Sequence, residues 1–139
     1  NFWTTWWTYC ERQLGYLDQL SEEFKDIGLQ VLAVNVNKAN IINQVRPYIK
    51  KRKYKFNVSV DPSSKLAKQF KVRGFPTFLL IDQEGNIIDK SSGYEEGMED
   101  KYLSKLLRYF DSQNIEYEPF KYAEKQSGIN KNGEVKIDF

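Results

Sequence analysis

Residues 1–10, Asn-Phe-Trp-Thr-Thr-Trp-Trp-Thr-Tyr-Cys, form the stretch from which the rest of the chain can be interpreted. Its aromatic and β-branched first half predicts the end of a β-strand and its exit loop. Apolar residues then recur every three or four positions, at Leu14, Leu17, Leu20 and Phe24. This spacing predicts an amphipathic helix from Thr8 to about residue 27, which Gly28 ends. Residues 1–10 are therefore a junction between a strand and a helix.

Strands and helices alternate along the following chain. Residues 29–36, 57–60 and 76–82 have the apolar, β-branched pattern of strands, and a turn at residues 83–86 predicts a hairpin with residues 87–90. A second helix is predicted to begin at Asn40 and to kink or break at Pro47. Two further helices are predicted by helical spacing of apolar residues, at Leu66, Ala67 and Phe70 and at Leu103, Leu106, Leu107 and Phe110.

This order predicts an α/β fold with a mixed central β-sheet and helices on both faces. Strands separated by helices are expected to be parallel neighbours, and the hairpin to add an antiparallel edge. We expect one domain at residues 1–111 and a polar C-terminal extension at residues 112–139, whose pattern allows a short helix and a final edge strand. A central strand of about three residues would be unusually short. We therefore expect either that residues upstream of Asn1 exist in the natural protein or that this strand is truncated.

Composition excludes several classes of function. The 21 basic and 19 acidic residues leave a net charge of +2, which gives no indication of a nucleic-acid partner. The absence of histidine excludes Ser-His, Cys-His and His-ligated metal chemistry, and the single cysteine excludes an internal disulfide, a thiolate zinc site and an ordinary dithiol couple. No apolar stretch approaches the roughly 20 residues of a membrane helix. We expect no cofactor and no metal.

A second motif lies at residues 72–77, Val-Arg-Gly-Phe-Pro-Thr, where a proline opens a strand. Proline cannot donate a hydrogen bond to a sheet, so Pro76 marks a special geometry, and a cis peptide bond is favoured. Together with residues 1–10 and the element order, this motif resembles the thioredoxin superfamily, and most closely its TlpA/ResA-like thiol–disulfide oxidoreductases. The helix at about residues 40–52 resembles the extra helix of that branch. The resemblance covers about residues 1–111.

The chain departs from this family at position 7. The resemblance aligns Trp7 with the attacking cysteine of the family's Cys-x-x-Cys motif and Cys10 with the resolving cysteine. A thiol at a helix N-terminus has a stabilised thiolate and acts as nucleophile, which an indole cannot do. We therefore expect impaired dithiol exchange. Since UGA encodes selenocysteine in some systems and Trp in others, the codon of residue 7 decides whether Trp7 is a decoding artefact.

The resemblance also implies a substrate-facing surface formed by Trp6, Tyr9, Phe75, Pro76 and Thr77. Four aromatic residues, Trp6, Trp7, Tyr9 and Phe75, would make an exposed cluster. Such a cluster is typical of a binding site, although the rings can also simply pack against one another. For Cys10 the alternative interpretation is a small buried hydrophobe without reactivity.

Three functions remain open at this stage. The first is an oxidoreductase that retains some monothiol exchange with protein or peptide thiols and disulfides through Cys10. The second is a redox-silent module that binds peptides or proteins at the aromatic surface around Trp7 and Pro76. The third is a structural role in a larger assembly. The family resemblance implies an extracytoplasmic location, periplasmic or membrane-anchored, with any anchor upstream of Asn1.

Overall fold

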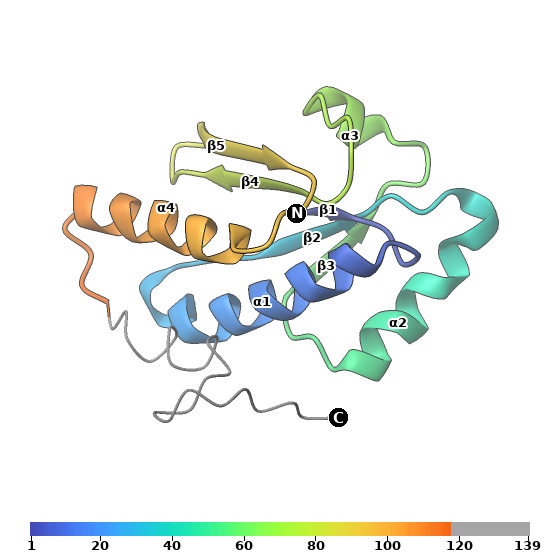
Figure 1. Cartoon of the computed structure of the whole chain (residues 1–139), viewed down its shortest axis with the longest axis horizontal. Helices are drawn as coiled ribbons and strands as arrows, with labels where there is room; N and C mark the ends of the chain where they lie inside the picture. The colour runs from blue at the N-terminus through green and yellow to red at the C-terminus, as the bar shows by residue number, and fades with distance from the viewer. Residues whose placement is uncertain (118–139) are drawn as a thin grey trace.

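A five-stranded sheet in the order β3-β2-β1-β4-β5 forms the centre of the structure (Figure 1). The structure, a computed structural model, describes residues 1–117. The strands are β1 (Phe2–Trp3), β2 (Leu32–Asn35), β3 (Asn57–Val60), β4 (Thr77–Ile81) and β5 (Ile87–Ser92). The predicted mixed sheet is confirmed, and its shortest strand, β1, lies at its centre.

The antiparallel part of the sheet is larger than expected. β1 is parallel to β2, and β2 is parallel to β3, as predicted for strands separated by helices. β4, however, runs antiparallel to β1, with Phe2 opposite Thr77. The hairpin of β4 and β5 therefore joins the sheet through an antiparallel contact with the central strand, so the prediction that helix-separated strands are parallel neighbours is wrong for this pair.

The helices occur close to where apolar spacing predicted them. They are α1 (Thr8–Phe24), α2 (Val45–Arg52), α3 (Lys65–Gln69) and α4 (Met98–Ser112), with 3₁₀ turns at Lys25–Ile27 and Ala39–Gln44. Asn40 does not begin an α-helix, because the chain first makes the 3₁₀ turn. Pro47 lies in the first turn of α2, where its missing N–H has no helical partner to lose. The prediction of a kink or break at Pro47 is therefore wrong: α2 runs through this residue, and the change from 3₁₀ turn to α-helix lies before Val45.

Helices cover both faces of the sheet, as predicted. α1 and α4 lie side by side on one face, where Leu17, Phe24, Phe78, Tyr102 and Phe110 belong to one buried cluster (Figure 1). α3 covers the other face through Ala67, which packs with Phe2 and Val34. Trp3, the next residue of β1, belongs to a third cluster, with Leu14 of α1 and Val45 of α2. Neighbouring side chains of β1 therefore point to opposite faces of the sheet.

α4 ends at Ser112, and Ile115 and Tyr117 beyond it still pack against the buried cluster of α1 and α4, so the domain boundary at residue 111 stays a prediction. Residues 118–139 of the predicted extension at 112–139, including the predicted edge strand, lie outside the described residues. Across residues 1–117, no helix is long and apolar enough to cross a lipid bilayer.

Candidate functional site

The N-terminus of α1 carries Trp7 and Cys10, the two residues that sequence analysis aligned with the family's cysteine pair. Trp7 is the N-cap, with extended dihedral angles of φ −99° and ψ 112°, and its side chain makes no capping hydrogen bond. The Cys10 backbone N–H donates to the Trp7 carbonyl oxygen at 3.0 Å, closing the first turn. The helix start is thus the electropositive position at which a thiolate would be stabilised, and an indole stands there instead.

The loop between β1 and α1 is fixed by the buried side chain of Asn37, which follows β2. The Thr5 backbone N–H donates to Asn37 Oδ1 at 3.1 Å, and Asn37 Nδ2 donates to Thr5 Oγ1 at 2.8 Å and to the Ile41 carbonyl oxygen at 3.3 Å. Asn35 Nδ2 donates to the same Asn37 Oδ1 at 3.3 Å. These bonds hold the segment that presents Trp6 and Trp7, and sequence analysis did not identify Asn37.

Cys10 lies inside the protein rather than at its surface. Its exposed fraction is 0%, and it packs in the cluster of Trp3 and Leu14, against which Phe75 also packs. Burial raises the pKa of the Cys10 thiol, and the nearby Thr4 backbone and hydroxyl offset part of that rise. At neutral pH the thiol is therefore protonated and shielded from solvent, which disfavours nucleophilic attack.

The proline loop meets the same cluster. The Phe75–Pro76 peptide bond is cis, and Phe75 is partly buried. Pro76 and Thr77 are buried, and Thr77 Oγ1 donates to the Gly74 carbonyl oxygen at 2.6 Å. The structure thus brings Phe75 and Cys10 to one cluster, while the side chains of Pro76 and Thr77 face the interior.

A row of four aromatic rings lies at the surface beside the start of α1. The Trp6 and Trp7 rings are 5.7 Å apart and nearly perpendicular, Trp7 and Tyr9 are 6.2 Å apart, and Tyr9 stacks on Tyr94 at 5.1 Å. Trp6, Trp7 and Tyr9 are 61%, 41% and 51% exposed. We call Trp6, Trp7, Tyr9 and Tyr94 the aromatic row. Sequence analysis predicted its first three members and missed Tyr94, which lies in the loop after β5.

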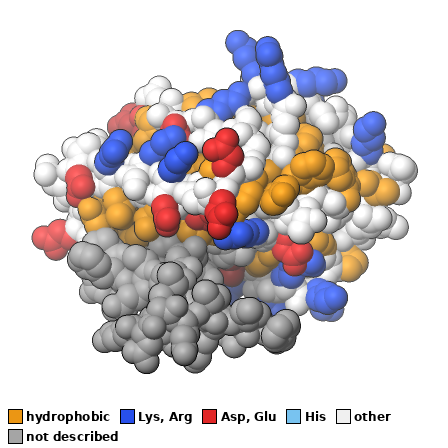
Figure 2. All heavy atoms as spheres, in the orientation of Figure 1, with side chains coloured by type: hydrophobic (Ala, Val, Ile, Leu, Met, Phe, Trp, Pro, Cys, Tyr) orange, Lys and Arg blue, Asp and Glu red, His pale blue; other side chains and the backbone are white. Residues whose placement is uncertain are grey.

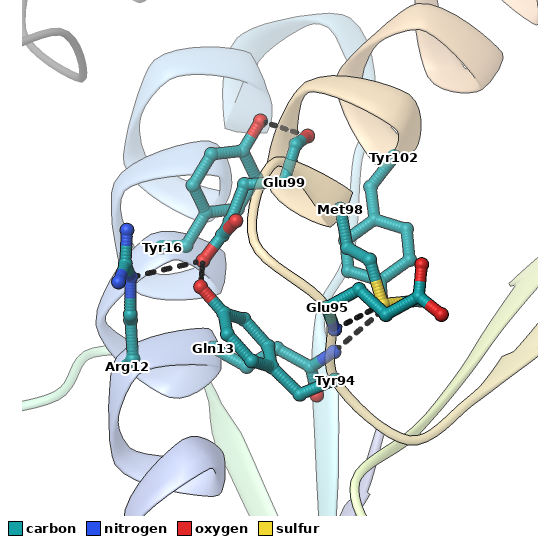
Figure 3. A network of polar contacts seen from close by, with 8 residues as sticks. All are labelled: Arg12, Gln13, Tyr16, Tyr94, Glu95, Met98, Glu99 and Tyr102. Carbon is teal, nitrogen blue, oxygen red and sulfur yellow. Dashed lines mark hydrogen bonds and ion pairs between the residues drawn. The ribbon is translucent and has the colours of Figure 1, made fainter.

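A polar network between α1 and α4 holds Tyr94 in place (Figure 3). The Tyr94 hydroxyl donates to Glu99 Oε1 at 2.8 Å, and Arg12 Nε lies 3.4 Å from the same oxygen. The Arg12 guanidinium also lies 5.6 Å from the centre of the Tyr94 ring. The Tyr16 hydroxyl donates to the Glu99 backbone carbonyl oxygen at 2.6 Å. Burial and the bond to Glu99 raise the pKa of Tyr94 to about 12, so it remains a neutral donor.

A second polar chain runs beneath the junction and is made of neutral groups. Asn1 Nδ2 donates to Gln13 Oε1 and, at 3.4 Å, to the Thr77 carbonyl oxygen. Gln13 is fully buried, and its Nε2 donates to the Tyr102 hydroxyl at 2.9 Å. Amides and a phenol thus occupy this part of the interior, and they are poor proton acceptors at neutral pH.

Other features of the described chain lie apart from this site. Within residues 1–117, no group of three His, Cys, Asp or Glu side chains could hold a metal ion. A cavity of about 550 Å³ lies where β2 and β4 extend past β1, and Leu32, Phe78 and Ile81 are among its apolar lining residues. Neither Trp7 nor Cys10 lines it.

Known proteins are similar to most of this chain. The AhpC/TSA family matches residues 1–90. The chain is 30% identical over 107 residues to the thiol-disulfide oxidoreductase ResA of Bacillus cereus, and 30% identical over 107 residues to ResA of Bacillus subtilis. These matches cover 76% of the chain and 61% and 59% of the relatives, so the chain spans about three fifths of their length.

Solved structures show the same architecture. The exposed lipoprotein thioredoxin Etrx1 of Streptococcus pneumoniae matches 77% of the chain and 80% of its own, with a TM-score of 0.64 and 31% identity. A putative thiol:disulfide interchange protein DsbE of Chlorobium tepidum matches 77% and 74%, with a TM-score of 0.72 and 24% identity. These likenesses confirm the predicted thioredoxin fold.

Proposed function

Because the chain belongs to the AhpC/TSA family, in the TlpA/ResA-like branch of the thioredoxin superfamily, we propose that it is a thiol–disulfide oxidoreductase-type protein whose dithiol exchange is impaired. The observation that carries this proposal is Trp7 at the N-cap of α1, with Cys10 buried behind it. By the family resemblance, Trp7 holds the nucleophile position and Cys10 the resolving position.

The chemistry of dithiol exchange explains the impairment. An attacking thiolate forms a bond to one sulfur of a substrate disulfide and expels the other sulfur as a thiolate, giving a mixed disulfide. The resolving thiolate then forms an intramolecular disulfide and releases the reduced substrate. An indole can neither form the first bond nor accept the second, so the cycle cannot begin at position 7.

Monothiol exchange through Cys10 is disfavoured by burial. We predict that the Cys10 thiol of the folded protein is inert towards oxidised glutathione at neutral pH, and that it reacts in urea at the rate of an ordinary cysteine. Quantifying the glutathione adduct by mass spectrometry measures both rates. Rapid modification of the folded protein would instead support a monothiol oxidoreductase.

The same burial predicts how stability depends on pH. The folded state holds the Cys10 proton more tightly than the unfolded chain, in which the thiol has an ordinary pKa of 9.0. The contribution of Cys10 to stability is therefore complete below pH 9 and is lost as the pH rises towards the raised pKa of the folded state. A Cys10→Ser variant, measured by urea unfolding across this range, should lose less stability above pH 9 than the native chain does. Parallel pH profiles of the two proteins would contradict the prediction.

A second candidate function, a redox-silent module that binds extended peptides, is favoured by the exposure of the aromatic row. Three large rings at 41% to 61% exposure form an apolar surface that a soluble domain does not need for its own packing. Aromatic anchors of this kind contribute much of the affinity of protein interfaces.

For this candidate we predict that Trp7→Ala weakens peptide binding about tenfold, because it removes a central ring of the row. The probe is the acetylated, amidated peptide Leu-Ser-Phe-Ser-Leu-Ser, titrated by isothermal calorimetry. Cys10→Ser serves as control and should leave the affinity unchanged. The module is rejected if the peptide does not bind the native chain, or if Cys10→Ser weakens binding while Trp7→Ala does not.

The proposed cellular setting rests on the relatives rather than on the geometry. Similarity to an exposed lipoprotein thioredoxin supports an extracytoplasmic location. Under the oxidoreductase proposal, the partners are protein or peptide thiols and disulfides, the groups named in the relatives' activity.

A further inference from the structure

The aromatic row has two acidic residues at its Tyr94 end. Glu95 and Glu96 follow Tyr94 directly in the loop between β5 and α4, and both are exposed. The negative charge of Glu96 is close enough to Tyr94 to help raise its pKa. Within residues 1–117, neither Glu95 nor Glu96 forms an ion pair. Two unneutralised carboxylates therefore lie at the Tyr94 end of the row.

The nearby cation does not neutralise these two residues. Arg12 lies 3.4 Å from Glu99 Oε1, and the Glu99 side chain is only 10% exposed, so the charge of Arg12 is paired with a buried carboxylate. The same contacts fix Tyr94 and hence the start of the acidic loop. The Glu95 backbone N–H donates to Met98 Sδ at 3.0 Å, which further limits where the loop can lie (Figure 3).

The spacing of the rings suits an extended chain. Successive rings of the row are 5.1 to 6.2 Å apart. In an extended peptide, side chains on one face are separated by two residues, or about 6.5 Å. Alternate apolar side chains of such a peptide can therefore contact successive rings. Figure 2 shows hydrophobic side chains gathered in a band across the face in view, with acidic and basic side chains beside it.

From these observations we propose that the aromatic row, together with Glu95 and Glu96, is a docking surface for an extended peptide that carries a basic residue beside its apolar ones. This inference rests on the peptide-binding candidate above and names the chemistry of its ligand. The basic side chain pairs with the carboxylates of the loop, and exposed Trp faces offer a further favourable site for a cation. The chain as a whole has a net charge of +2, so selectivity for a basic peptide must arise locally.

The test compares two forms of the probe peptide, one with Lys at both ends and one with Glu at both ends, so that its direction on the row does not matter. The native chain is expected to bind the Lys form about fivefold more tightly, a preference that falls with added salt. The double variant Glu95→Gln/Glu96→Gln should bind both forms equally. Glu84→Gln, an exposed carboxylate in the turn at the far end of β4, is the matched control and should retain the preference.

Each other outcome contradicts the proposal in a distinguishable way. Equal binding of both peptides by the native chain, or a preference unchanged in the double variant, would refute the role of the acidic residues while leaving peptide binding intact. If neither peptide binds the native chain, the peptide-binding candidate itself is refuted. If sedimentation shows self-association that Trp6→Ala abolishes, the row is occupied by a second copy of this chain and the proposal fails.

Discussion

Replacing Trp7 by cysteine is expected to create an active dithiol oxidoreductase. The new thiol would lie at the N-cap of α1, three residues before Cys10 and on the same side of the helix. Thiols at helix N-termini have pKa values of roughly 3.5 to 7.5, so about a quarter or more would be thiolate at pH 7, against about 3% for an ordinary cysteine. Ionisation alone therefore gives the new thiol a thiolate fraction at least about 8-fold that of an ordinary cysteine, so disulfide reduction should rise clearly above the background rate expected of the native chain.

The control for this experiment is the double variant Trp7→Cys/Cys10→Ser. It keeps the new nucleophile but lacks the resolving thiol, so it should form a mixed disulfide with the substrate and then stop. Accumulation of that adduct, seen by mass spectrometry, would show that residue 7 attacks and residue 10 resolves. If Trp7→Cys folds normally and yet shows no exchange, then the rest of the site is not competent and the missing nucleophile is not the cause.

Replacing Asn37 by alanine is expected to give the largest loss of stability among the changes near the site. The substitution removes the Asn37 partner of the Thr5 N–H, the Asn35 amide and the Ile41 carbonyl oxygen, of which the Asn35 amide is buried and the other two groups are partly buried. Each buried group without a partner costs about 1–3 kcal/mol, partly recovered by relaxation, so we expect a loss of about 3 kcal/mol in the free energy of unfolding. Urea denaturation measures it.

Asn40→Ala is the matched control, because Asn40 is exposed in the 3₁₀ turn that follows. Its free energy of unfolding should change by less than about 0.5 kcal/mol. Asn37→Ala should also weaken the near-ultraviolet circular dichroism signal of the Trp6–Trp7 pair, because the loop that holds these rings becomes free to move. A loss below about 1 kcal/mol would mean that the loop is held by other contacts.

The fold was largely predictable because local patterns and long-range packing agree. The helical spacing of Leu14, Leu17 and Leu20 gives the buried face of α1, and Gly28 ends the turn after it with a φ of 100°. The antiparallel pairing of β1 with β4 could not be read from local sequence. It depends on where the chain returns to the sheet after α3, which no residue pattern within β4 encodes.

The site was predictable only in part, for reasons of burial and distance in the chain. Trp6, Trp7 and Tyr9 were identifiable as an exposed group because they crowd a helix start that has no need of aromatic residues. Tyr94 joins them through contacts with Glu99 and Arg12 that link residues far apart in sequence. Asn37 is one of several asparagines, and its burial distinguishes it only in three dimensions.

The most direct test of the account is turnover of a peptide disulfide by the native chain with excess dithiothreitol as the terminal reductant. The predicted result is a rate equal to that of dithiothreitol alone, because Trp7 cannot attack and Cys10 is buried as a neutral thiol. Turnover as fast as that of a relative with an intact Cys-x-x-Cys motif would contradict it.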